Sequence, residues 1–84
     1  MSIFIQTLSY QNASKQKVVL IVEPWAEQYG VEPGQQVDIV GQGGEAGSKF
    51  ELLHTDNEII VFGWANSVVT VMRDGEEISP DEQN

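Results

Sequence analysis

VVLIV, residues 18–22, is the first of five short apolar segments that decide the fold of this chain. The others are VDIV (37–40), FELL (50–53), IIVF (59–62) and VVTVM (68–72). Each segment is rich in β-branched or aromatic residues and is bounded by turn-forming residues, which is typical of strands in a small, mostly antiparallel β domain. We therefore expect a mainly β fold of about five to seven short strands, arranged as a small antiparallel β-barrel or as a twisted sheet.

Extended to their nearest turn signals, the five segments give expected strands over residues 17–23, 36–40, 49–55, 58–64 and 68–73. Two further strands are expected over residues 3–10 and 76–78. Pro33-Gly34 predicts a type II turn, and Asp74-Gly75 predicts a tight hairpin. We expect a single β domain over residues 1–78, followed by a frayed acidic tail over residues 79–84.

One short helix is expected over residues 24–29, PWAEQY. Pro24 suits the first helical position, and Gly30 suits the position after the last turn. Trp25 and Tyr29 are four residues apart, so in a helix they would lie on one face, toward the sheet.

The charge balance restricts the partners. Thirteen acidic residues face four basic ones, which gives a formal net charge of −9. Such a surface repels nucleic acid and anionic lipid, so we expect neither a nucleic acid nor a membrane as partner, while a basic protein remains compatible. The chain has no cysteine, and its first residues lack the basic and apolar regions of a signal peptide, which together favour the cytoplasm.

Several expected strands carry apolar residues on both faces, which bears on assembly. A single sheet in a chain of 84 residues cannot cover both faces with a two-turn helix. Either the sheet closes into a barrel, or a second copy covers the exposed face in a homodimer. The side chains expected to form this interaction surface are aliphatic and lie on the strand faces opposite those that carry most of the aromatic residues. They are Ile3, Ile5, Val19, Ile21, Ile59, Val61, Val69 and Val71.

The motifs that suggest chemistry are weak. His54 is the only histidine, and with Asp56 and Glu58 it is a candidate for a metal, ligand or acid–base site. Strand alternation places His54 on the face of Phe50 and Leu52, which favours a partly buried structural histidine. Gly41-x-Gly43-x-x-Ala46 resembles a dinucleotide fingerprint, but a strand follows it where the fingerprint needs a helix. We therefore expect a flexible loop there and no cofactor.

Residues 18–39 resemble part of one known family. Val18-Val19, Pro24, Gly30-Val31-x-Pro33-Gly34 and Val37-Asp38-Ile39 are similar to the strand, short helix and Pro-Gly turn of AbrB/MazE-type swapped-hairpin domains. That family is dimeric and binds DNA, as transition-state regulators or antitoxins. The resemblance covers about a quarter of the chain and implies the same strand–helix–strand arrangement. The segment from Pro24 to Gly30 is shorter than the usual helix of the family, and its basic DNA-contacting residues have no counterpart here.

Three hypotheses about function follow. The first is a small, acidic, non-enzymatic interaction module that forms a homodimer. The second is a swapped-hairpin transcriptional regulator or antitoxin, as the AbrB/MazE-type resemblance implies. The third is a small enzyme or ligand-binding protein centred on His54, Asp56 and Glu58.

Overall fold

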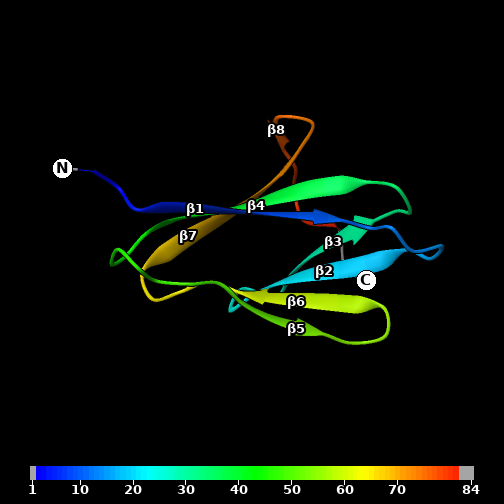
Figure 1. The fold of residues 1–84 in the computed structure, drawn as a ribbon, viewed down its shortest axis with the longest axis horizontal. Helices are drawn as coiled ribbons and strands as arrows, with labels where there is room; N and C mark the ends of the chain where they lie inside the picture. The colour runs from blue at the N-terminus through cyan, green and yellow to red at the C-terminus, as the bar shows by residue number, and fades with distance from the viewer. Residues whose placement is uncertain (1, 82–84) are drawn as a thin grey trace.

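The computed structural model describes residues 2–81, which form eight strands in two four-stranded sheets and contain no helix. Figure 1 shows the two twisted sheets as stacked layers. The strands are β1 (Ile5–Gln11), β2 (Val18–Glu23), β3 (Glu27–Val31), β4 (Gln36–Gly43), β5 (Glu51–His54), β6 (Glu58–Phe62), β7 (Ser67–Arg73) and β8 (Glu76–Glu77). The prediction of a mainly β domain is confirmed. Of its two forms, the structure has the twisted sheets and not the closed barrel.

The first sheet, sheet A, has the strand order β1-β4-β7-β8, and the second, sheet B, has the order β3-β2-β6-β5. All neighbouring strands are antiparallel except β2 and β6, which run parallel. Gly34 has a φ of 85°, and the amide of Gln35 donates to the carbonyl of Glu32, as a type II turn requires. Asp74 and Gly75 both have positive φ and form the hairpin between β7 and β8.

The core lies between the two sheets, because alternate residues of each strand face the opposite layer. Its buried side chains are Leu20, Val22, Tyr29, Val31, Val37, Ile39, Val61 and Val71. Burial raises the pKa of Tyr29 to about 12, and the nearby carboxylate of Glu27 adds to this shift. Burial also raises the pKa of Tyr10.

The helix expected over residues 24–29 is absent, and this prediction was wrong. Residues 24–26 form a turn after a cis Glu23–Pro24 peptide, and Ala26 has a φ of 57°. The chain then returns as β3, antiparallel to β2. A two-turn helix makes few backbone hydrogen bonds of its own, whereas β3 pairs along its whole length with β2 and buries Tyr29 and Val31. The strand–helix–strand arrangement implied by the AbrB/MazE-type resemblance is therefore not found, and β3 makes the strand count one higher than the expected range.

Asn12 joins three segments of the chain at one end of the sandwich. It is 1% exposed, and its side-chain nitrogen donates to the carbonyls of Gln16 and Val31 at 2.8 and 2.9 Å. Its side-chain oxygen accepts from the amide and the hydroxyl of Ser14. Asn12 thus holds the end of β1, the loop before β2 and the end of β3 together.

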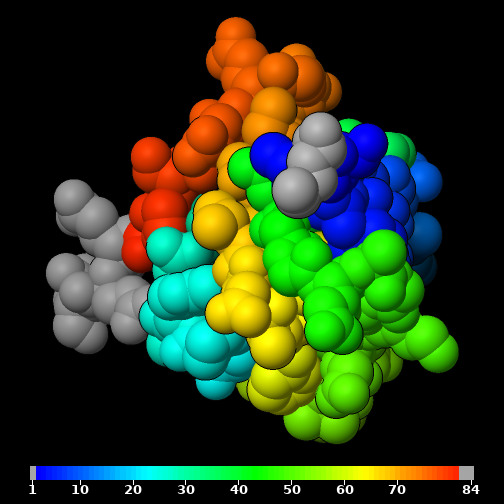
Figure 2. All heavy atoms as spheres, turned by 90° about the vertical axis from the view of Figure 1, so that its left-hand side faces the viewer, coloured from blue at the N-terminus to red at the C-terminus, as the bar shows by residue number. Residues whose placement is uncertain are grey.

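An aromatic cluster closes the other end of the sandwich. Trp64 contacts Phe4 and Phe50 edge to face, with ring centroids 5.7 and 4.9 Å away, and its indole nitrogen donates to the carbonyl of Gly43. Viewed from this end in Figure 2, the N-terminal segment, the loop after β4 and the segment after β6 lie side by side.

The tail expected to fray, residues 79–84, lies partly outside the described residues, which end at Asp81. Asp81 contacts the edge of β3. Its amide donates to the carbonyl of Gln28, and its carboxylate accepts from the amide of Gly30.

Candidate interaction surface

The outer face of sheet B carries an uninterrupted aliphatic row. Ile21 of β2 lies opposite Ile60 of β6, and Ile60 lies opposite Leu53 of β5. Their neighbours along the strands, Leu20, Ile59, Val61 and Val22, face the core or its margin, so the row points outward. Val19, two residues before Ile21 on β2, and Phe62, two residues after Ile60 on β6, lie on the same face. Leu53 and Phe62 are 52% and 38% exposed.

Carboxylates border this apolar row. Glu23 and Glu51 lie on either side of Phe62, and Glu58 lies beside Val19. We call the whole surface the acid-rimmed face, and it consists of Val19, Ile21, Leu53, Ile60 and Phe62 with Glu23, Glu51 and Glu58. One oxygen of Glu23, Oε1, is shielded from solvent and accepts no hydrogen bond from the described residues.

The outer face of sheet A is different, although it also exposes large side chains. Its cross-strand rows alternate in polarity, because Gln42 separates Ile5 from Val68, and Val40 lies between Thr7 and Thr70. No two aliphatic side chains are direct cross-strand neighbours in these two rows. Val68 is 59% exposed but has no aliphatic cross-strand neighbour in its row. Single exposed apolar residues of this kind are ordinary on protein surfaces.

The eight residues expected to form one interaction surface do not lie together. Val61 and Val71 are buried in the core, and Ile59 and Val69 pack against it. Ile5 is exposed on the outer face of sheet A, and Ile3 is exposed before β1. Only Val19 and Ile21 belong to the acid-rimmed face.

Ile60 and Phe62 belong to this face, although the sequence pattern placed them opposite the expected interaction surface, and Leu53 was not assigned to that surface. The alternation along residues 58–64 was correct, but both faces of β6 are apolar. The aromatic side chains Phe62 and Trp64 suggested that their face was the inner one, whereas the register with β2 directs Ile59 and Val61 inward. Only the pairing of β6 with a buried neighbour distinguishes the two faces.

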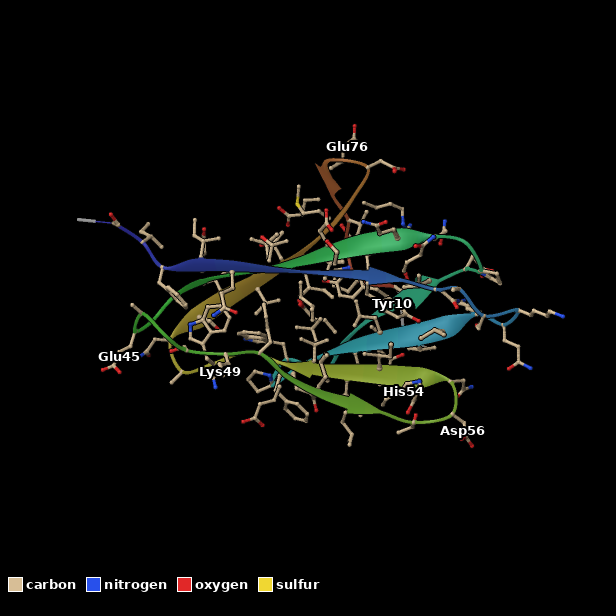
Figure 3. All side chains as sticks on the ribbon, viewed as in Figure 1. Tyr10, Glu45, Lys49, His54, Asp56 and Glu76 are labelled. Carbon is tan, nitrogen blue, oxygen red and sulfur yellow. The ribbon has the colours of Figure 1, made fainter. Side chains whose placement is uncertain are left out.

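His54, Asp56 and Glu58 do not form a site. His54 ends β5 and is exposed, so the expected partial burial is not found. Glu58 lies opposite Val19 on the outer face of sheet B, whereas His54 lies opposite Ile59, which faces the core. Figure 3 shows Asp56 at the tip of the loop between them. Among residues 2–81, no group of three or more His, Cys, Asp or Glu side chains is placed to hold a metal ion.

The glycine-rich loop after β4 has no helix behind it, as the sequence indicated. A shallow hollow beside it is lined by Gly44, Glu45, Ser48, Ala65 and Asn66. The carboxylate of Glu45 disfavours a phosphate there. A smaller apolar cavity of about 90 Å³ opens between the sheets, beside Leu8, Ile39, Leu52 and Ile59.

None of the described residues belongs to a helix long and apolar enough to cross a membrane. Comparison with protein-family models, with curated proteins and with solved structures found no match. The function is therefore inferred from the residues of this chain alone.

Proposed function

We propose that this chain is a non-enzymatic interaction module of the cytoplasm that binds a basic protein surface through the acid-rimmed face. The single observation that supports this proposal is the uninterrupted outward row of Ile21, Ile60 and Leu53. Contiguous apolar patches on small soluble domains are commonly binding sites. A partner that covers the row removes this aliphatic surface from water and so gains affinity.

The charges around the row favour a cationic partner. Glu23, Glu51 and Glu58 surround the aliphatic centre, and the whole chain has a net charge of −9. Complementary charge at the rim speeds association and selects partners.

The same charge argues against nucleic acid, the partner implied by the AbrB/MazE-type resemblance. Nucleic-acid affinity depends on neutralising phosphates with basic side chains, and this chain has four of them. Arg73, one of the four, already donates to the carbonyl of Gly30. We expect no mobility shift of duplex DNA even at low salt, and a salt-dependent shift would favour the swapped-hairpin regulator instead.

The proposal is tested with two matched helical peptides. Each has leucines along one face, and the flanking positions are lysine in one peptide and glutamate in the other. The lysine peptide should bind at least about tenfold more tightly than the glutamate peptide, as measured by isothermal titration calorimetry. Equal affinities, or no binding of either peptide, would contradict the proposal.

A pair of surface variants locates the binding. Phe62→Ser removes an exposed aromatic from the acid-rimmed face, and Val68→Ser removes an exposed aliphatic from sheet A. Phe62→Ser should weaken binding of the lysine peptide about tenfold, while Val68→Ser leaves it unchanged. The reverse order would place the binding surface on sheet A.

A further inference from the structure

Strand β5 offers an unprotected sheet edge beside the acid-rimmed face. It is the last strand of sheet B, and all four of its residues are exposed. Leu52 and Leu53 are 55% and 52% exposed, although their side chains point to opposite faces. Natural edge strands are usually protected by lysine, proline or a bulge, and the sequence of β5, ELLH, contains neither lysine nor proline.

The other edge of sheet B is closed. The amide of Asp81 and the guanidinium of Arg73 donate to the carbonyls of Gln28 and Gly30 on β3, and the carboxylate of Asp81 accepts from the amide of Gly30. These contacts occupy backbone groups to which a further strand would bind. Sheet B is thus open for extension at β5 and blocked at β3.

The backbone of β5 determines which residues would pair. The amide of Thr55 donates to the carbonyl of Glu58, so the polar groups of Thr55 point toward β6. Because these directions alternate along an antiparallel strand, Leu53 and Glu51 also point toward β6, while Leu52 and His54 direct their amides and carbonyls outward.

We propose that two copies of this chain pair antiparallel along β5, about a two-fold axis at Leu53, to form one continuous sheet. Leu52 of each copy then exchanges backbone hydrogen bonds with His54 of the other. Leu53 lies opposite Leu53 of the second copy, and Glu51 lies opposite Thr55, so no like charges are paired directly. The aliphatic row of Ile21, Ile60 and Leu53 continues without interruption into the row of the second copy.

This pairing deepens the proposed function. The role of the dimer rests on the proposed function, whereas the pairing of the two β5 strands does not. It joins two acid-rimmed faces into one longer surface, which suits a partner with an extended basic surface. Two chains of net charge −9 repel each other, so the dimer should tighten severalfold between low and moderate salt as the repulsion is screened.

The register is tested by single-cysteine cross-linking, since the natural chain has no cysteine. Directly opposed residues of a non-hydrogen-bonded antiparallel pair have Cα atoms about 4.5 Å apart, within reach of a disulfide. Under mild oxidation, Leu53→Cys should form covalent dimers at least about tenfold faster than Leu52→Cys and Val68→Cys. Faster cross-linking of Leu52→Cys would overturn this register, and faster cross-linking of Val68→Cys would overturn the choice of edge.

Sedimentation equilibrium of the full chain tests the pairing without a disulfide. His54→Pro removes an outward amide that β6 does not use, whereas His54→Ala keeps it. The wild type and His54→Ala should dimerise, and His54→Pro should be monomeric while its circular dichroism spectrum stays unchanged. If His54→Pro loses its fold, Leu52→Lys takes its place, because it adds a charge to the same edge.

A wild-type chain that is monomeric at every concentration and salt would overturn the dimer. Binding of the lysine peptide by such a monomer would leave the proposed function intact. Conversely, a dimer that binds neither peptide would contradict the proposed function and keep the pairing.

Discussion

The side-chain amide of Asn12 donates a hydrogen bond to the backbone carbonyl of Val31, 2.9 Å away and shielded from solvent. The same nitrogen donates to Gln16, so one buried side chain satisfies carbonyls of two segments. Asn12-Ala13-Ser14 matches the acceptor pattern for N-glycosylation, but the nitrogen that would carry the sugar is buried and already engaged. Asn12 is therefore a structural residue.

Replacing Asn12 should be among the most damaging polar substitutions in the chain. Asn12→Ala leaves the carbonyl of Val31 buried without its donor, so we expect the free energy of unfolding to fall by about 2–4 kcal/mol. Asn57→Ala, in the exposed loop between β5 and β6, is the matched control and should change it by less than about 0.5 kcal/mol. Urea denaturation of both variants measures the difference, and equal effects would show that the Asn12 hydrogen bonds contribute little.

Gly41 should tolerate no side chain, because Trp64 lies against its backbone. A Cβ at position 41 would stand 2.4 Å from the Trp64 ring and 2.8 Å from the Phe50 ring. We expect Gly41→Ala to cost about 1–3 kcal/mol of stability through overpacking. At Gly30 the nearest atoms belong to the flexible end of Lys17, so Gly30→Ala should cost clearly less. Thermal unfolding of the two variants tests this order.

The buried hydroxyl of Tyr29 predicts a loss of stability in alkali. The pKa of Tyr29 is about 12 in the folded chain and about 10 in the unfolded chain, so the unfolded chain loses this proton first as the pH rises. The protonated Tyr29 hydroxyl contributes its full stabilisation below pH 10. This stabilisation is lost between about pH 10 and 12, which lowers the free energy of unfolding by about 2–3 kcal/mol. Denaturation of the wild type and Tyr29→Phe across this range measures it. The variant should show a shallower decline, and an identical decline would assign the effect to other groups.

The acidic rim should make binding of the lysine peptide depend on salt. Glu58→Gln removes one carboxylate beside the aliphatic row, and we expect it to weaken binding by about threefold at low salt and not at high salt. Glu76→Gln, on β8 of sheet A, is the control and should have little effect (Figure 3). Equal effects of the two substitutions would mean that only the net charge matters.

Sequence patterns predicted seven of the eight strands, six from apolar repeats bounded by turns and β8 from the Asp74-Gly75 hairpin signal before it. They failed at β3, where Pro24, Trp25 and Tyr29 have the spacing of a short helix. Tyr29 and Val31 also alternate as in a strand, and only the presence of β2 as a pairing partner decides between the two. For the candidate site, the sequence could not determine which face of β6 points outward. Ile59 and Ile60 are equally apolar, and only the pairing of β6 with β2 selects which one is buried.

The central claim is that the acid-rimmed face is the binding surface of this chain. An NMR titration of the ¹⁵N-labelled wild-type protein with the lysine peptide tests it most directly, because each backbone amide reports its own surroundings. The amides of Ile21, Leu53, Ile60 and Phe62 should shift, while those of Ile5 and Val68 on sheet A stay in place. Shifts centred on sheet A, or an unchanged spectrum, would contradict the account.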